Sequence, residues 1–103
     1  MLLIARTPER SEAERIGEQL VERRLAASGS VLPAIHSFRR LEGKLQREHE
    51  ALLLITTSTE RSAEAQAELR ALHSDPDPEI LELPITGGSA TYLAWLLNEV
   101  RSH

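Results

Sequence analysis

Two long extended segments, joined at Glu42 and Gly43, constrain this chain more than any other feature of the sequence. An acidic residue followed by glycine is typical of a tight hairpin turn, because glycine readily takes the positive φ that such turns require. The arms, residues 31–41 and 44–57, each hold roughly a dozen residues, so at about 3.3 Å per residue each could reach about 40 Å. A helix over residues 9–26 would span only about 27 Å. The hairpin therefore outgrows the helices that could cover it, and we expect other copies of the chain to complete it.

The composition predicts a single domain over residues 1–103 with an aliphatic core. Charged residues make up 27% and hydrophobic residues 41%, as in ordinary globular proteins, but aromatic residues only 3%. A domain of this length can bury enough surface for a modest core. The chain has no cysteine, which excludes disulfides, thiolate metal ligands and cysteine nucleophiles.

Charge and hydropathy argue against nucleic acids and membranes as partners. The net charge is −4, and the basic residues are spread along the chain apart from Arg23-Arg24 and Arg39-Arg40, so no phosphate-binding patch is evident. No apolar run approaches the length of a membrane span, and the apolar start of the chain is too short for a signal peptide. We therefore expect a cytoplasmic protein.

The hydrophobic pattern predicts four strands and three helices. Short or alternating apolar runs indicate strands, and apolar residues three or four positions apart indicate helices. The expected strands span residues 2–6, 31–41, 44–57 and 79–85, and the expected helices span 9–26, begin at Thr57 or Thr59, and follow Ser89. This order matches an α+β, ferredoxin-like (split βαβ) sandwich, in which two helices cover one face of an antiparallel sheet and a C-terminal helix is an addition.

Local signals indicate where these elements end. We expect Thr7 to cap the first helix, Gly29 to end it and Ser89 to cap the last one. The continuous apolar run 51–55 follows an alternating stretch, so this part of the strand should be covered on both faces. Pro33 cannot donate a hydrogen bond to a sheet, and it therefore marks a strand start, an edge or a bulge.

His36 and His49 lie at equal offsets from the Glu42-Gly43 turn, so a regular hairpin would make them direct cross-strand neighbours. Such a pair could form a two-histidine metal site, or it could be two polar residues on a solvent-exposed ribbon. Because a bulge at Pro33 would shift the register nearby, we favour the second interpretation.

His73 and Glu79 are the candidate metal ligands of this sequence. They flank a proline-rich connector, and imidazole nitrogen and carboxylate oxygen both suit copper or zinc. On spacing alone, a helix-end histidine and a strand-start carboxylate without metal are the simpler interpretation. No other cofactor is indicated.

The sequence shows no catalytic pattern. Gly87-Gly88 lacks a G-x-G-x-x-G pattern or a Walker lysine, and no G-x-S-x-G surrounds a serine nucleophile. No acid–base pair with a matched context is evident. We therefore expect a protein that is not an enzyme.

Short matches to one family run through nearly the whole chain with almost no insertions. They comprise Leu20-Val21-Glu22-Arg23-Arg24-Leu25-Ala26-Ala27, Pro33, Ser37, Arg40, Glu42-Gly43-Lys44, the 52–55 run with Thr56-Thr57, Ala71-Leu72-His73, Pro78-Glu79-Ile80, Leu83-Pro84-Ile85, and Tyr92-Leu93 with Trp95-Leu96. In this order they resemble the CutA family, the divalent-cation tolerance proteins.

The resemblance implies a ferredoxin-like subunit in a tight homotrimer, in which long hairpins extend the sheets of neighbouring subunits. It implies a role in the response to metal ions, with copper binding proposed and no enzymatic activity. The fold and trimer also resemble PII-like signal-transduction proteins, so the alternative is a PII-like sensing or adaptor trimer with small molecules bound at subunit clefts.

Several positions depart from the family pattern. Ser28 stands where the family usually has cysteine, Arg39 and Leu41 stand where it usually has tyrosine and tryptophan, and Asp75 ends a His73-Ser74-Asp75 run where it usually has His-Pro-Tyr. A soft-metal site using that cysteine cannot form here, because serine is a poor copper ligand. His73 and Glu79 remain, and Asp75 or Asp77 could add oxygen, so the resemblance implies a weakened or altered metal site.

Overall fold

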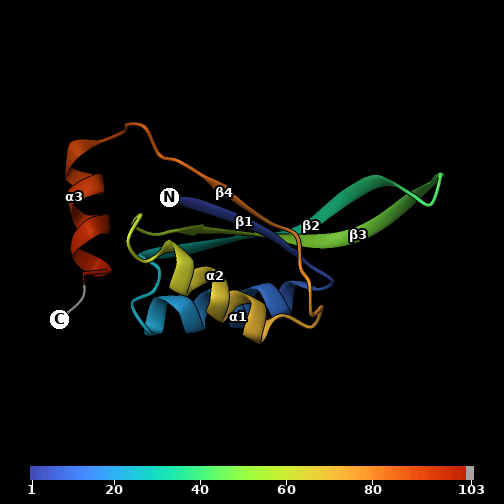
Figure 1. Cartoon of the computed structure of the whole chain (residues 1–103), viewed down its shortest axis with the longest axis horizontal. Coiled ribbons are helices and arrows are strands. Elements are labelled where there is room, and N and C mark those ends of the chain that lie inside the picture. Colours follow the sequence, from blue (N-terminus) through green and yellow to red (C-terminus); the bar gives the residue numbers. More distant parts are fainter. Residues whose placement is uncertain (102–103) are drawn as a thin grey trace.

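The computed structural model describes residues 1–101 and has the expected α+β architecture (Figure 1). Four antiparallel strands form one sheet in the order β2-β3-β1-β4, which is the order of a ferredoxin-like sheet. The elements are β1 (Leu2–Thr7), α1 (Arg10–Glu22), β2 (Ser28–Leu41), β3 (Lys44–Thr56), α2 (Ser62–Leu72), β4 (Ile80–Leu83) and α3 (Ala90–Glu99).

The helices α1 and α2 lie side by side over one face of the sheet, and the core lies between these two layers (Figure 1). Alternate residues of β1 and β3 point into this layer, which is why only every second residue is buried. The fully buried core is aliphatic and comprises Leu3, Ala5, Ala13, Ile16, Leu20, Ala51, Leu53, Ile55, Ala65 and Leu69. The expected aliphatic core is therefore present.

The opposite face of the sheet is apolar too, but α1 and α2 do not cover it, and within residues 1–101 only α3 approaches it, at the end where Tyr92 meets Ser28 and Thr56. The strand register aligns its members across all four strands, and we call this surface the open face: Leu2, Ile4, Leu32, Leu52, Leu54, Leu81 and Leu83. Leu81 is 59% exposed and Leu32 is 48% exposed. The expectation that run 51–55 is covered on both faces was wrong for a single chain, because helices cover one side only.

The β2–β3 hairpin projects beyond both helices as a ribbon (Figure 1). Its strands stay paired as far as Leu41 and Lys44, and the molecule measures 46 × 26 × 21 Å. At the turn, Glu42 has a φ of 52° and Gly43 has a φ of 77°, as a type I′ hairpin turn requires. The predicted turn and the projecting ribbon are both confirmed.

The first helix is shorter than residues 9–26. It starts at Arg10 with Glu9 at the N-cap position, while Thr7 belongs to β1 and its hydroxyl donates to the Glu9 carbonyl at 2.7 Å, so Thr7 is not the cap. It ends at Glu22, because Arg24 takes a φ of 58° and closes a Schellman motif.

Two hydrogen bonds define that motif: Leu25 N donates to Leu20 O at 2.9 Å and Arg24 N donates to Val21 O at 3.0 Å. Gly29 therefore does not end the helix. It lies in β2 opposite Ile55, where an added Cβ would come within 3.2 Å of the Ile55 side chain.

The other element ends also differ from the expectation in part. The second helix begins at Ser62 rather than near Thr57 or Thr59, since residues 58–61 form a turn in which Ser58 Oγ accepts from Arg61 N at 3.1 Å. Strand β4 is only four residues long. The Ser89 cap is confirmed, because its side chain accepts from Tyr92 N at 3.4 Å.

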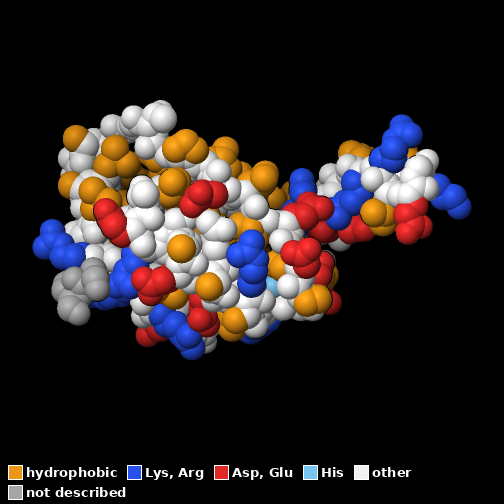
Figure 2. Space-filling model, in the orientation of Figure 1, with side chains coloured by type: hydrophobic (Ala, Val, Ile, Leu, Met, Phe, Trp, Pro, Cys, Tyr) orange, Lys and Arg blue, Asp and Glu red, His pale blue; other side chains and the backbone are white. Residues whose placement is uncertain are grey.

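Helix α3 packs at the end of the sheet away from the ribbon. Leu96 and Val100 form a small buried cluster with Ala27, and Arg61 Nε donates to the Val100 carbonyl at 2.9 Å. Hydrophobic side chains gather on the surface along β4 and α3 (Figure 2). This apolar surface continues the open face toward α3.

Candidate functional site

The predicted ligands His73 and Glu79 lie on one polar cleft. Three parts of the chain form it: the end of β1, the base of the ribbon and the connector between α2 and β4. The cleft has a volume of about 280 Å³ and is lined by Arg6, Pro8, Arg39, Glu48, Glu50, His73, Asp75, Asp77, Pro78 and Glu79. We call it the connector cleft.

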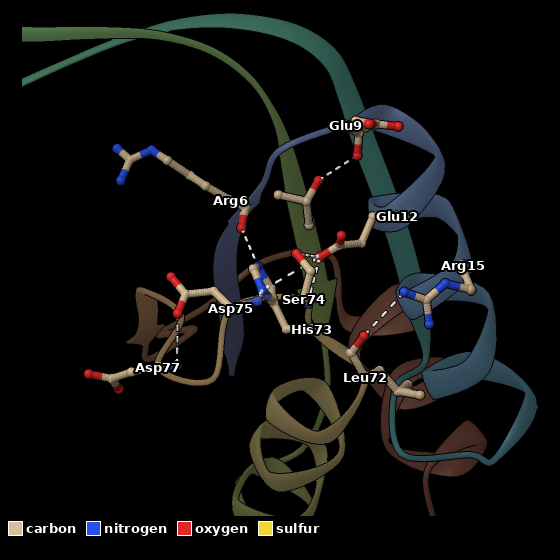
Figure 3. Close-up of polar contacts among 10 residues, drawn as sticks. Arg6, Glu9, Glu12, Arg15, Leu72, His73, Ser74, Asp75 and Asp77 are labelled. Atoms are coloured by element: carbon tan, nitrogen blue, oxygen red, sulfur yellow. Dashed lines mark hydrogen bonds and ion pairs between the residues drawn. The ribbon is translucent and has the colours of Figure 1, made fainter.

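The His73 ring is buried, with 4% of its side chain exposed, and both ring nitrogens have partners within the chain (Figure 3). Nε2 lies 2.7 Å from the Arg6 carbonyl, and Nδ1 accepts from the Asp75 amide at 2.9 Å. These contacts fit the tautomer with its proton on Nε2. His73 thereby ties the start of the connector to the end of β1.

Glu12 on α1 fixes the same end of the connector. Its carboxylate accepts from the backbone nitrogen and the hydroxyl of Ser74, each at 3.0 Å, and lies 3.5 Å from His73 Nδ1. A hydrogen bond within the connector adds to this order: Asp75 Oδ1 accepts from the Asp77 amide at 3.0 Å (Figure 3). The connector is therefore ordered by contacts with two other elements, the Glu12 side chain of α1 and the Arg6 carbonyl of β1.

Glu79 lies between two arginines. It accepts from Arg6 Nη1 at 2.6 Å and from Arg39 Nη1 at 3.2 Å, and Arg39 also donates to Glu50 at 3.0 Å. Glu79 is 57% exposed, so each pair contributes little alone, but together they join β1, β4 and the ribbon base. The network fixes the direction in which the ribbon leaves the core.

The connector cleft is acidic but is not a preformed metal site. Its lining holds five carboxylates and two arginines, a balance that favours cations. Two of those carboxylates, Glu50 and Glu79, are already paired with arginine. Among residues 1–101, no group of three or more histidine, aspartate or glutamate side chains is placed to hold a metal ion. A metal ligand role for His73 or Glu79 would require their present partners to be displaced, and it stays a prediction.

The positions that depart from the family pattern do not come together in the single chain. Ser28 lies at the far end of the sheet, where its Oγ is 2.5 Å from Thr56 Oγ1, whereas Leu41 lies beside the hairpin turn. Hydrogen bonds from the Ser28 and Thr56 side chains lower the pKa of Tyr92 below its usual value. Of these four positions, only Arg39 and Asp75 line the connector cleft.

The sequence analysis did not identify Arg6, Glu12 or Glu50 as members of this site. Two of them act through partners far away in the sequence, since Arg6 lies 73 positions from Glu79 and Glu12 lies 62 positions from Ser74, whereas Glu50 meets Arg39 across the hairpin, 11 positions away. No local spacing marks such pairs. Only the ferredoxin-like chain order, which returns β4 to the side of β1, could have suggested the contact between Arg6 and Glu79.

Within the described residues, no helix combines the length and the apolar character needed to cross a membrane.

The family model described as "CutA1 divalent ion tolerance protein" matches residues 1–99. No catalytic activity is named in that description.

Relatives with this name occur in distant organisms. The chain is 34% identical over 101 residues to the divalent-cation tolerance protein CutA of Pectobacterium atrosepticum, covering 98% of this chain and 92% of that protein. It is 37% identical over 95 residues to the chloroplastic CutA protein of Arabidopsis thaliana, covering 92% of this chain but only 52% of the longer plant protein.

A solved structure has the same fold. The periplasmic divalent cation tolerance protein CutA of Archaeoglobus fulgidus superposes with a TM-score of 0.90 at 34% identity, covering 97% of each chain. Because one relative is named chloroplastic and another periplasmic, the cytoplasmic location stays a prediction. From the match along residues 1–99 and the shared fold, we conclude that this chain belongs to the CutA1 family of divalent ion tolerance proteins.

Proposed function

We propose that the chain is the subunit of a homotrimer that acts in the cellular response to divalent metal ions. The observation that carries the assembly is the open face. Its seven aliphatic side chains span all four strands, and α1 and α2, the helices that cover the sheet within residues 1–101, lie on the other face. Contiguous apolar surfaces of this kind mark interaction sites on folded proteins.

The ribbon supports the same assembly. Its apolar side chains are largely in water in the single chain: Phe38 is 60% exposed, Leu41 is 55% exposed and Leu45 is 63% exposed. The outer edge of β2 also leaves backbone groups unpaired within the chain, because β2 lies at the end of the sheet order. A neighbouring copy that adds a strand or a sheet face there would cover the apolar side chains and pair the backbone groups of the β2 edge.

The metal part of the proposal is supported by the family and by the acidic balance of the connector cleft. Copper or zinc would find imidazole and carboxylate donors in His73, Glu79, Asp75 and Asp77. Because the present partners occupy His73 and Glu79, binding there would be weak unless assembly or the metal rearranges the connector. Calorimetric titration of copper and zinc, with His73→Ala for comparison, tests this; submicromolar binding that His73→Ala leaves unchanged rejects that ligand.

A PII-like sensing trimer is the alternative, and the relatives named above do not favour it, since their names concern cation tolerance. A thermal-shift screen separates the two functions, because a ligand that binds only the folded state raises the melting temperature by mass action. Copper or zinc should raise it under our proposal. Stabilisation by nucleotides or other small metabolites, with no response to metals, supports the alternative.

The cellular role is tested in bacteria that lack their own homologue. Expression of this chain should raise the copper or zinc concentration that stops growth, and a variant that folds but cannot trimerise should not. Equal growth inhibition with and without the chain would contradict the proposed role.

A further inference from the structure

The imidazoles of His36 and His49 face each other on the ribbon, outside the connector cleft. The strand register pairs the two residues directly, and their Nε2 atoms lie 3.3 Å apart. The bulge at Pro33 does not disturb this pair, because the register shift falls between Leu32 and Ile35, on the core side of His36. The ladder is continuous from His36 to the turn, so the backbone holds the two rings opposite each other.

The separation of the two nitrogens matches a chelate. Two imidazoles on one tetrahedral zinc ion, each with an N–Zn distance near 2.0–2.1 Å, have their nitrogens about 3.3–3.4 Å apart. We propose that His36 and His49 form an open two-histidine site for a divalent ion of the class that imidazole prefers, such as copper, zinc or nickel. Water fills the remaining positions of the ion.

Small ring rotations are enough to form this site. The ring centroids are now 4.2 Å apart at an interplanar angle of 66°, and they would open to about 5 Å when both lone pairs point at one ion. Both side chains are exposed, and the Phe38 ring stands edge-on to His36 with its centroid 6.4 Å away, so the rings have room to turn toward the solvent. Without metal, an N–H···N hydrogen bond between the rings accounts for the same 3.3 Å contact, and the experiment below separates the two.

The surroundings suit an exchangeable site rather than a closed one. The next cross-strand pair on the same face of the ribbon is Phe38 and Arg47, and the Arg47 guanidinium lies over the Phe38 ring, 5.5 Å from its centroid. Glu48 lines the same cavity as the two histidines, but as the strand neighbour of His49 its side chain points to the other face, so the two imidazoles are the ligands of the proposed site. Within residues 1–101, no third histidine or carboxylate is grouped with this pair to hold a metal ion. The remaining coordination positions are therefore open to water or to a small ligand that arrives with the ion.

The pair lies on the side of the sheet away from the open face. His49 alternates in phase with Ala51 and Leu53, which point toward the helices, while Leu52 and Leu54 point the other way. Copies that cover the open face would therefore approach from the opposite side of the ribbon. The site uses neither His73 nor Glu79, and it stands even if the function proposed above fails.

Titration of the full-length protein with zinc or copper chloride tests this site. The variants are His36→Ala, His49→Ala and the double variant, with His103→Ala as a control for a histidine outside the described residues. Each single variant should lose affinity by at least about tenfold, the lower limit for loss of an outer-shell partner. The double variant should lose little more affinity than either single one, because removal of one ring already destroys the chelate.

Copper electron paramagnetic resonance provides the second readout. Coupling to two imidazole nitrogens per ion should appear in the wild type and in His103→Ala, and coupling to one or none in each single variant. Unchanged binding in the double variant overturns the proposal, as does an independent, additive loss from the two single variants. Because both residues are exposed, these variants should retain the far-ultraviolet circular dichroism of the wild type.

Discussion

Leu81→Asp should split the assembly while each subunit stays folded. Leu81 lies on the edge strand β4, opposite Ile4 on the open face, and it is 59% exposed in the single chain. A change at such a surface position should alter the stability of an isolated subunit by about 1 kcal/mol or less. In the proposed trimer, the same carboxylate would be buried against apolar side chains.

The size of the effect follows from the exposed fraction. Full burial of a leucine side chain stabilises by about 1.5–3 kcal/mol, so covering the exposed 59% of Leu81 should contribute about 1–2 kcal/mol per subunit. Three subunits lose about 3–5 kcal/mol of association energy from this term alone. Desolvation of an unpaired carboxylate adds several kcal/mol per site. Since 1.4 kcal/mol is tenfold, the trimer should weaken by at least about a hundredfold.

Light scattering coupled to size-exclusion chromatography measures the assembly, and circular dichroism measures the fold. Leu81→Met is the matched control, because it keeps the volume and the apolar character of the side chain. We expect a folded Leu81→Asp subunit of about one-third the wild-type mass and an unchanged Leu81→Met trimer. If Leu81→Asp remains trimeric at micromolar concentration, the open face is not the interface.

Three further predictions concern single sites. Gly43→Ala places a Cβ at a φ of 77° and should cost about 1–2 kcal/mol in urea unfolding, whereas Gly87→Ala, whose Cβ also meets open space but without a positive φ, should cost less. His73→Ala removes a buried ring with two hydrogen-bond partners and should destabilise by about 1–3 kcal/mol, measured the same way; an effect below about 0.5 kcal/mol would show that the ring does not order the connector. Tyr92 is the one tyrosine of the chain, so ultraviolet titration should give a folded midpoint below 10.0 that rises in Ser28→Ala. Because its pKa is lower folded than unfolded, Tyr92 should add stability as the pH rises through the folded midpoint toward 10.0, with the full contribution above it; a midpoint at or above 10.0 would contradict the contacts with Ser28 and Thr56.

The elements and their order could be predicted because their signals are local. The Glu42-Gly43 turn needs positive φ at both residues. Turns of this kind favour a small acidic or amide residue followed by glycine, so an acidic residue before glycine in the sequence already indicates one. The same turn fixed the register, so the His36–His49 pairing followed by counting from it. The expected bulge at Pro33 also lies where the proline is.

The end of α1 was missed because its signal was absent. Helices that end in a Schellman motif usually have glycine at the left-handed position, but here Arg24 takes that conformation. The backbone nitrogens of Leu25 and Ala26 then both donate to the Leu20 carbonyl, and β2 begins at Ser28. The positive φ of Arg24 is strained for a residue with a side chain, so a sequence pattern alone does not predict it. Packing of Leu20 and Ala26 in the core offsets this backbone strain.

The contacts of the candidate site could not be predicted, because they join residues that only the folded chain brings together. His73 meets Arg6 across 67 positions, and Arg39 meets Glu79 across 40 positions. The sequence offered His73 and Glu79 as candidate ligands, and both line the connector cleft, but spacing could not show that arginines and backbone groups contact them. Side-chain partners of this kind depend on the meeting of β1, the ribbon and the connector.

We propose that neighbouring copies cover the apolar sheet face and the projecting ribbon, and the mass of the assembly tests this most directly. Sedimentation equilibrium of the wild-type protein at micromolar concentration should give three times the 11.5 kDa mass of one chain. A stable, folded species of 11.5 kDa at that concentration would contradict the account, because the open face would then remain in water without a neighbour.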